Sequence, residues 1–290
     1  MLQLIEQVLD QFTVLEPLAD QLQKLFGEVL AQGGEQAKQV KDVLNGVWFE
    51  HPLHPAVTDI PIGAWTCATM LDLASAGDAR LTKAADVLIG VGCLGAVGAA
   101  VTGVADWQDT YGKERRIGLA HGLLNLGALS MFLTSLSLRR SGSRPLGVLV
   151  SLAGYGIALV SSYLGGDLVF RMGTQVNRTA WIEGPDEWTA AIADGEVPEG
   201  KLVRANAGDV PVLLCRQNGR LHAISAVCPH AGGPLDEGTL EGGSVICPWH
   251  GSQFALVDGA IIHGPASVQP PLYETRVQNG QIEVRRAQTV

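Results

Sequence analysis

Four side chains in the C-terminal third of the chain have the types and the spacing of a metal site. They lie in two short hooks, Cys228-Pro-His230 and Cys247-Pro-Trp-His250, and sixteen residues separate the first hook from the second. Cysteine thiolates and neutral imidazoles are ligands of zinc and of iron–sulfur clusters. The four residues therefore predict either a Cys2His2 zinc ion or an iron–sulfur centre.

The residues around the hooks favour the iron–sulfur centre. Glycines follow both hooks, as a loop that wraps closely around a cluster requires, and Gly264-Pro265-Ala266 lies downstream. The run Cys-Pro-Trp-His-Gly-Ser-Gln-Phe over 247–254 resembles the second hook of the Rieske [2Fe–2S] domain, and the resemblance extends over about 175–290.

The Rieske resemblance implies a ligand set. Cys228 and Cys247 would bind one iron, and His230 and His250 would bind the other. Two neutral imidazoles in place of two thiolates make the cluster less negative and raise its reduction potential above that of an all-cysteine cluster. The loop containing Pro265 would cover the cluster.

Four further positions bear on the cluster's potential. Gly233 and Trp249 stand where Rieske proteins of respiratory complexes carry two cysteines joined by a disulfide, so the resemblance implies no bridge here. Ser252 can donate a hydrogen bond to a cluster sulfur, whereas Phe254 replaces a tyrosine that often does so. Because fewer donors stabilise the reduced cluster less, we expect a potential in the lower, ferredoxin-like range.

The composition indicates a membrane protein. The mean hydropathy is positive, at +0.19, and only 17% of the 290 residues are charged. Four apolar stretches, at about 55–77, 84–106, 117–138 and 145–165, are each long enough to cross a bilayer as a helix. The formal net charge of −9 argues against a nucleic-acid partner.

The domain order follows from these patterns. We expect an amphipathic helical segment over 1–45, a four-helix transmembrane domain over 46–170, a linker over 171–180, and a Rieske domain over 181–290. Hairpin signals such as Asn218-Gly219 and Asn279-Gly280 predict an all-β antiparallel sandwich for the last domain. The fold class is thus a multidomain membrane protein, with an α-helical bundle followed by a β-sandwich.

The charges that flank the spans predict an orientation. Seven basic residues flank the side that holds both termini and five flank the other, which places the N-terminus and the Rieske domain on the cytoplasmic side of a bacterial cytoplasmic membrane. The N-terminus also lacks the basic region of an export signal. Glycine-rich spans permit a homodimer.

The membrane region carries a second resemblance. His51-Pro-Leu-His54-Pro, Gly103-Val-Ala-Asp-Trp107 and His121-Gly-Leu-Leu-Asn125 resemble a four-helix bacterial membrane family of unknown function, over about 46–175. Polar residues in membrane spans are costly and are usually functional. Those expected at one end of the bundle are His51, His54, Asp59, Asp106, His121, Asn125 and Asp167.

Three interpretations of this polar group remain open. A haem could be held between His54 and His121, with His51 as a substitute for His54. A quinone could bind where His and Asp exchange protons with it. Alternatively, the histidines have a structural role: they form hydrogen bonds with Asp59, Asp106 or Asp167 and fix the loops.

The favoured function is a membrane-anchored electron-transfer protein that exchanges single electrons with a soluble redox protein or reductase. One alternative is a redox or iron sensor, and another is the ferredoxin component of a multi-subunit oxygenase or quinone reductase. We expect no self-contained Rieske oxygenase, because the 40 residues after the second hook leave no room for a catalytic domain. No nucleophile, catalytic triad or phosphate loop is apparent, so the sequence predicts no catalytic residue.

Overall fold

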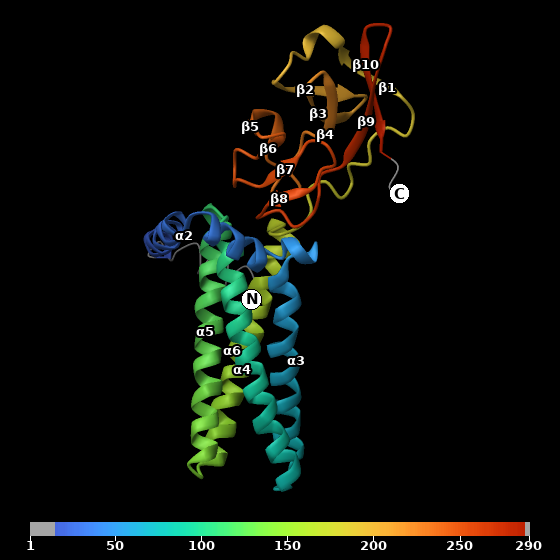
Figure 1. Cartoon of the computed structure of the whole chain (residues 1–290). Coiled ribbons are helices and arrows are strands. Elements are labelled where there is room, and N and C mark those ends of the chain that lie inside the picture. Colours follow the sequence, from blue (N-terminus) through green and yellow to red (C-terminus); the bar gives the residue numbers. More distant parts are fainter. Residues whose placement is uncertain (1–14, 288–290) are drawn as a thin grey trace. The chain divides into compact units, whose positions relative to one another are not determined.

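The computed structural model describes residues 15–287, and these fold into two units (Figure 1). One unit is helical and ends at Thr174; the other is mostly β-structure and begins at Gln175. A short segment, 38–52, belongs to the β unit although it precedes the membrane helices in the chain. The part of the expected N-terminal helix over 1–14 lies outside the described residues.

The helical unit is a bundle of long helices joined by tight turns. Asp78 caps one helix by accepting a hydrogen bond from the Arg80 backbone N–H at 2.7 Å. Gly77 and Gly142 have positive φ in two of the turns, where the left-handed region favours glycine. The helices are α3 (Leu53–Ala74), α4 (Ala79–Trp107), α5 (Gly112–Arg140) and α6 (Arg144–Asp167), which continues into a π-helical turn, η2 (Leu168–Met172).

The bundle consists of two helical hairpins. Helix α3 packs closely on α4, and α5 packs closely on α6, whereas the two hairpins contact each other less. Trp65 stacks on Phe132 across the hairpins, with ring centroids 4.1 Å apart. Gly92 lies directly behind Trp65, because a Cβ there would come within 2.3 Å of the indole.

Large apolar side chains cover the outside of the bundle, among them Leu94 and Leu149. Within the described residues, three helices are long and apolar enough to cross a membrane: Ala79–Trp107, Gly112–Arg140 and Arg144–Met172. Helix α3 is not among the three; it contains His54, Asp59 and an internal proline. The fourth crossing therefore stays a prediction.

An ion-pair network joins the helices at the end of the bundle where α5 ends and α6 begins. Arg139 is 1% exposed and donates to Asp72 at 2.5 Å and to Asp86 at 2.9 Å. Arg144 also contacts both carboxylates. The charges of the four side chains balance, as a buried ionic group requires.

Helix α2 (Leu15–Asn45) is kinked at Gly34, whose φ of 55° is not helical. Before the kink it packs on the bundle, where the Gln23 side-chain amide donates to the Trp107 carbonyl at 2.9 Å. Residues 38–45 of the same helix, and the 3-10 turn η1 (Val47–Phe49), belong to the β unit.

The β unit contains two antiparallel sheets, as the hairpin signals predicted. The larger has the order β1-β10-β9-β4-β3-β2 and the smaller the order β5-β6-β7-β8. The larger sheet comprises β1 (Thr189–Ala193), β2 (Leu202–Ala207), β3 (Val210–Gln217), β4 (Arg220–Ser225), β9 (Leu272–Gln278) and β10 (Gln281–Arg286). The smaller comprises β5 (Thr239–Glu241), β6 (Ser244–Ile246), β7 (Gln253–Ala255) and β8 (Ile261–His263); η3 (Asp194–Glu196) and η4 (Leu235–Glu237) are short 3-10 turns.

Candidate metal centre

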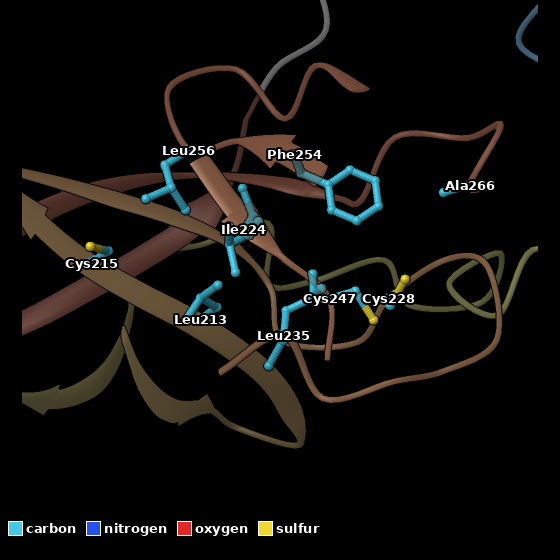
Figure 2. Packing of buried hydrophobic residues seen from close by; sticks show 11 residues of the cluster. Leu213, Cys215, Ile224, Cys228, Leu235, Cys247, Phe254, Leu256 and Ala266 are labelled. Atoms are coloured by element: carbon cyan, nitrogen blue, oxygen red, sulfur yellow. The ribbon is translucent and has the colours of Figure 1, made fainter. Parts of the chain in front are cut away.

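Two loops at the smaller sheet hold the four predicted ligands. The first, 228–233, precedes η4, and the second, 247–252, joins β6 to β7. The Cys228 and Cys247 side chains point toward each other, with their sulfur atoms adjacent, from the edge of an apolar core (Figure 2). His230 and His250 converge as well, since their Nδ1 atoms are 3.2 Å apart.

The two loops share one hydrogen-bond pattern. In each, the cysteine N–H donates to the carbonyl five residues on, which is Gly233 at 2.8 Å in the first loop and Ser252 at 2.8 Å in the second. The N–H of the fourth residue after each cysteine, Gly232 or Gly251, donates back to the cysteine carbonyl. Both of these glycines have φ near 80°, a conformation that side chains with a Cβ rarely adopt.

The space around the cysteines explains one further glycine. A Cβ on Gly233 would lie 2.9 Å from the Cys247 sulfur and 3.1 Å from the Trp249 ring. All five cysteines, which fall within the described range, are free thiols.

Burial sets the protonation of the ligand side chains. Desolvation, aided by His250 and by the positive charges of Lys41 and Arg178, lowers the pKa of His230 to about 3. The imidazole is therefore neutral, which is the form that binds a metal. The hydrogen bond between the two thiols and their burial raise the pKa of Cys228, while the same hydrogen bond lowers the pKa of Cys247 to about 6.

The loop that contains Pro265 is fixed to the ligand loops. The Ser252 Oγ accepts a hydrogen bond from the Ala266 N–H at 3.0 Å, and both residues are buried. Ala266 and Phe254 belong to the same apolar cluster as the two cysteines (Figure 2). Trp249, by contrast, is 53% exposed.

Asp42 is a residue of this region that the sequence did not indicate. Its carboxylate accepts hydrogen bonds from the His263 Nδ1–H and from the Gly264 N–H, both at 2.8 Å. It thereby holds the start of the loop containing Pro265, from a helix about 220 residues earlier in the chain. No local sequence signal links positions so far apart.

The structure brings together only some of the polar residues predicted at one end of the bundle. His51 and Asp59 are exposed, and Asp106 and Asp167 are buried, with Asp167 paired to Arg171 at 3.3 Å. His54, His121 and Asn125 come together: the two imidazole centroids are 6.4 Å apart, and Asn125 Nδ2 donates to His121 Nε2 at 3.0 Å. The two histidines bind backbone carbonyls rather than the aspartates.

Comparison with known proteins agrees with both units. Residues 187–279 match the Rieske [2Fe-2S] domain, and residues 50–178 match a predicted membrane protein domain, DUF2231. An antiparallel sandwich with two Cys/His loops, joined to a helical membrane domain, therefore defines a membrane-anchored iron–sulfur protein of the Rieske type.

Individual relatives identify the family of the β unit. Ferredoxin CarAc of Metapseudomonas resinovorans is 30% identical over 98 residues, which are 33% of this chain and 92% of that protein. Through its C-terminal unit, the chain belongs to the Rieske ferredoxin family.

Larger proteins and a chain of a solved structure are also similar to part of this chain. Apoptosis-inducing factor 3 of Mus musculus is 31% identical over 90 residues, 31% of this chain, and the chain spans 15% of that relative's length. The cytochrome b6-f complex iron-sulfur subunit of Chlorobaculum thiosulfatiphilum is 32% identical over 106 residues, which are 37% of this chain and 57% of that protein. The complex of reduced oxygenase and oxidized ferredoxin in carbazole 1,9a-dioxygenase contains a chain that is 27% identical, with 36% of this chain and 98% of that chain covered and a TM-score of 0.33.

Proposed function

We propose that Cys228, His230, Cys247 and His250 hold a Rieske [2Fe–2S] cluster, and that the chain carries single electrons between this cluster and a soluble redox partner. The observation that carries the proposal is the pair of equivalent loops. Each loop supplies one thiol and one imidazole, and the four groups converge. A zinc ion would use the same four ligands, but the family to which the chain belongs favours the cluster.

The residues around the cluster have different roles. When bound, the cluster accepts or gives up one electron at a time. The thiolates and neutral imidazoles hold it, and the Gly232 and Gly251 turns let the backbone approach closely. Because the Ser252 Oγ accepts from Ala266, its own proton is left to donate to a cluster sulfur, whereas Phe254 can donate nothing. This donor set supports a potential in the ferredoxin-like range.

Trp249 and the acidic surface of the domain support a soluble partner. Trp249 lies next to His250, with ring centroids 6.4 Å apart, and its exposed indole is a contact point beside a cluster ligand. The domain has eight basic and thirteen acidic residues over 175–290, so a basic redox protein is attracted to it. The similarity to ferredoxins, one of them the ferredoxin component of an alkene monooxygenase system, also favours service as the ferredoxin component of an oxygenase or reductase system.

The location of the domain is part of the proposal. Four membrane crossings, with both ends of the chain on the cytoplasmic side, agree with the distribution of basic residues around the helices. A soluble cytoplasmic electron carrier then has access to the cluster. The glycine-rich helices would allow two copies to associate.

Electron paramagnetic resonance of the reduced, detergent-purified chain tests the cluster assignment. We expect a Rieske spectrum that disappears in Cys247→Ser and persists in Cys215→Ser, a buried cysteine of the same domain. A zinc site would give bound zinc and no iron signal, which would refute the assignment.

The glycine beside the cysteines gives an independent test. Gly233→Ala places a Cβ 2.9 Å from the Cys247 sulfur, so we expect the variant to lose most of its iron and acid-labile sulfide. The matched control is Gly195→Ala, where nothing lies within 4 Å of the added atom. Equal cluster content in both variants would show that the cluster does not occupy this space.

A further inference from the structure

The two helical hairpins of the bundle are built in the same way around one histidine each. In the first, the His54 Nδ1 on α3 lies 2.8 Å from the Ala99 carbonyl on α4; in the second, the His121 Nδ1 on α5 lies 2.8 Å from the Ser161 carbonyl on α6. A hydroxyl is also near each Nδ1, from Thr102 at 3.4 Å and from Ser161 at 3.0 Å. The hairpins thus present equivalent imidazoles to one another.

A glycine stands behind each imidazole. Gly103 follows Ala99 by four residues and Gly165 follows Ser161 by four, so each glycine is one helical turn from the carbonyl that holds the ring. A Cβ on Gly103 would come within 2.8 Å of His54 Cε1, and one on Gly165 within 3.0 Å of His121 Cε1. The close approach of helix and ring requires glycine at both positions.

The hydrogen bonds fix which ring nitrogen carries the proton. A carbonyl oxygen can only accept, so Nδ1 is protonated in both rings and Nε2 keeps its lone pair. The donation from Asn125 to His121 Nε2 agrees with this tautomer, and the Asn125 amide must turn away when the same lone pair binds a metal. Among the described residues, no hydrogen bond reaches His54 Nε2. Histidines that bind a metal are oriented in this manner, with the other ring N–H given to a carbonyl.

The distance between the rings fits a shared iron. An imidazole nitrogen binds a first-row metal at about 2.0–2.1 Å, which puts two rings on opposite sides of one ion with centroids about 6 to 6.5 Å apart. The centroids of His54 and His121 are 6.4 Å apart. The two histidines come from different hairpins, so a flat macrocycle between them would lie at the interface between the hairpins. The helices pack less closely across this interface than within each hairpin.

We propose that the helical unit binds one haem, with His54 and His121 as its two axial ligands. The chain has no Cys-x-x-Cys-His attachment motif, so the haem is a non-covalent b-type haem. Its iron changes between Fe(III) and Fe(II) by gaining or losing one electron, which is the same unit of charge that a Rieske cluster carries. The proposal goes beyond the cluster assignment and does not depend on it.

The test uses the full chain, produced under haem-replete growth and purified in detergent. We expect one haem per chain by the pyridine haemochrome assay, and a sharp low-spin spectrum on reduction with dithionite. His54→Ala and His121→Ala should each lower the haem content at least about tenfold. His51→Ala is the matched control, because His51 is exposed and lies before α3, and it should retain the haem.

The cluster signal of the same samples distinguishes failure of the haem proposal from failure of the cluster proposal. A variant that keeps its cluster spectrum and the helical circular dichroism of the wild type, but loses the haem, shows that both units are folded and that the histidine was a ligand. His54→Met, which keeps a ligand of another kind, should retain haem with shifted bands even if the alanine variant does not fold. Cluster-replete wild-type protein that contains no haem, and that takes up none when titrated with hemin, would overturn the proposal; so would haem that survives both alanine variants.

Discussion

Asp42 links the N-terminal helix to the loop that contains Pro265, and removing its carboxylate should loosen that loop. The carboxylate accepts two hydrogen bonds at 2.8 Å, from the His263 imidazole and the Gly264 N–H. Its side chain is 18% exposed, so water replaces these bonds poorly. The ligand loops have their own hydrogen bonds and do not depend on Asp42.

The size of the effect follows from the two bonds. A hydrogen bond to a charged group contributes about 1.5–3 kcal/mol, and Asp42→Ala leaves the Gly264 N–H without its acceptor. With partial compensation by water we expect a loss of about 2–4 kcal/mol in the closing of the loop, or about 30- to 1000-fold in its equilibrium. Asp42→Asn keeps one acceptor oxygen and should lose about half of that free energy.

Hydrogen exchange measures this opening directly. The Gly264 amide should exchange faster in Asp42→Ala by the factor given above, and the visible bands of the cluster should bleach faster in the presence of an iron chelator. Asp258→Ala is a suitable control, since Asp258 accepts from the Ala260 N–H in an exposed turn of the same domain. If exchange at Gly264 in Asp42→Ala stays within about threefold of wild type, the carboxylate does not hold the loop and the reasoning fails.

Two further predictions concern charge. Lys41→Ala removes a positive charge that acts on His230, so the cluster potential should fall by about 10–40 mV, measured by redox titration; Lys38→Ala, at an exposed position nearby, should change it less. Arg139→Met leaves the buried Asp72 carboxylate with less compensation and should destabilise the bundle by about 3–5 kcal/mol, seen as a lower melting temperature in detergent. Adding Asp72→Asn to that variant should restore part of the loss, and a double variant no more stable than Arg139→Met would argue against the charge explanation.

The local geometry of the two hooks could be predicted from the sequence, because the residues that determine it lie close together in the chain. Each hook places a cysteine, a histidine and a glycine within five residues, and the turn geometry that these residues require is what the structure has. Two hairpins of the larger sheet followed from Asn-Gly turns between short apolar runs for the same reason. The membrane helices followed from length and composition, with boundaries that differ from the predicted spans by a few residues.

Interactions between distant parts of the chain could not be predicted. Asp42 lies on a helix of polar sequence, and only the tertiary fold of the β unit brings residues 38–45 to the loop at His263. The ion-pair network at Arg139 could not be predicted either, because Asp72 and Asp86 come from two other helices. In the sequence they are simply acidic residues near the ends of apolar stretches. Hydrophobic periodicity and secondary-structure propensity describe one helix or strand at a time, whereas these contacts depend on how several elements pack.

The metal centre and the histidine pair of the bundle share a principle that neither sequence pattern shows alone. In the β unit, two loops with the same hydrogen bonds each provide one cysteine and one histidine; in the helical unit, two hairpins with the same carbonyl and glycine arrangement each provide one imidazole. In both, the distance between the halves is set by packing between repeated elements rather than by chain spacing. A substitution that shifts one hairpin, such as Gly165→Ala behind His121, should therefore reduce haem binding while leaving the cluster unchanged. Loss of both centres together in this variant would mean that it acts on the fold as a whole and not on the ring it contacts.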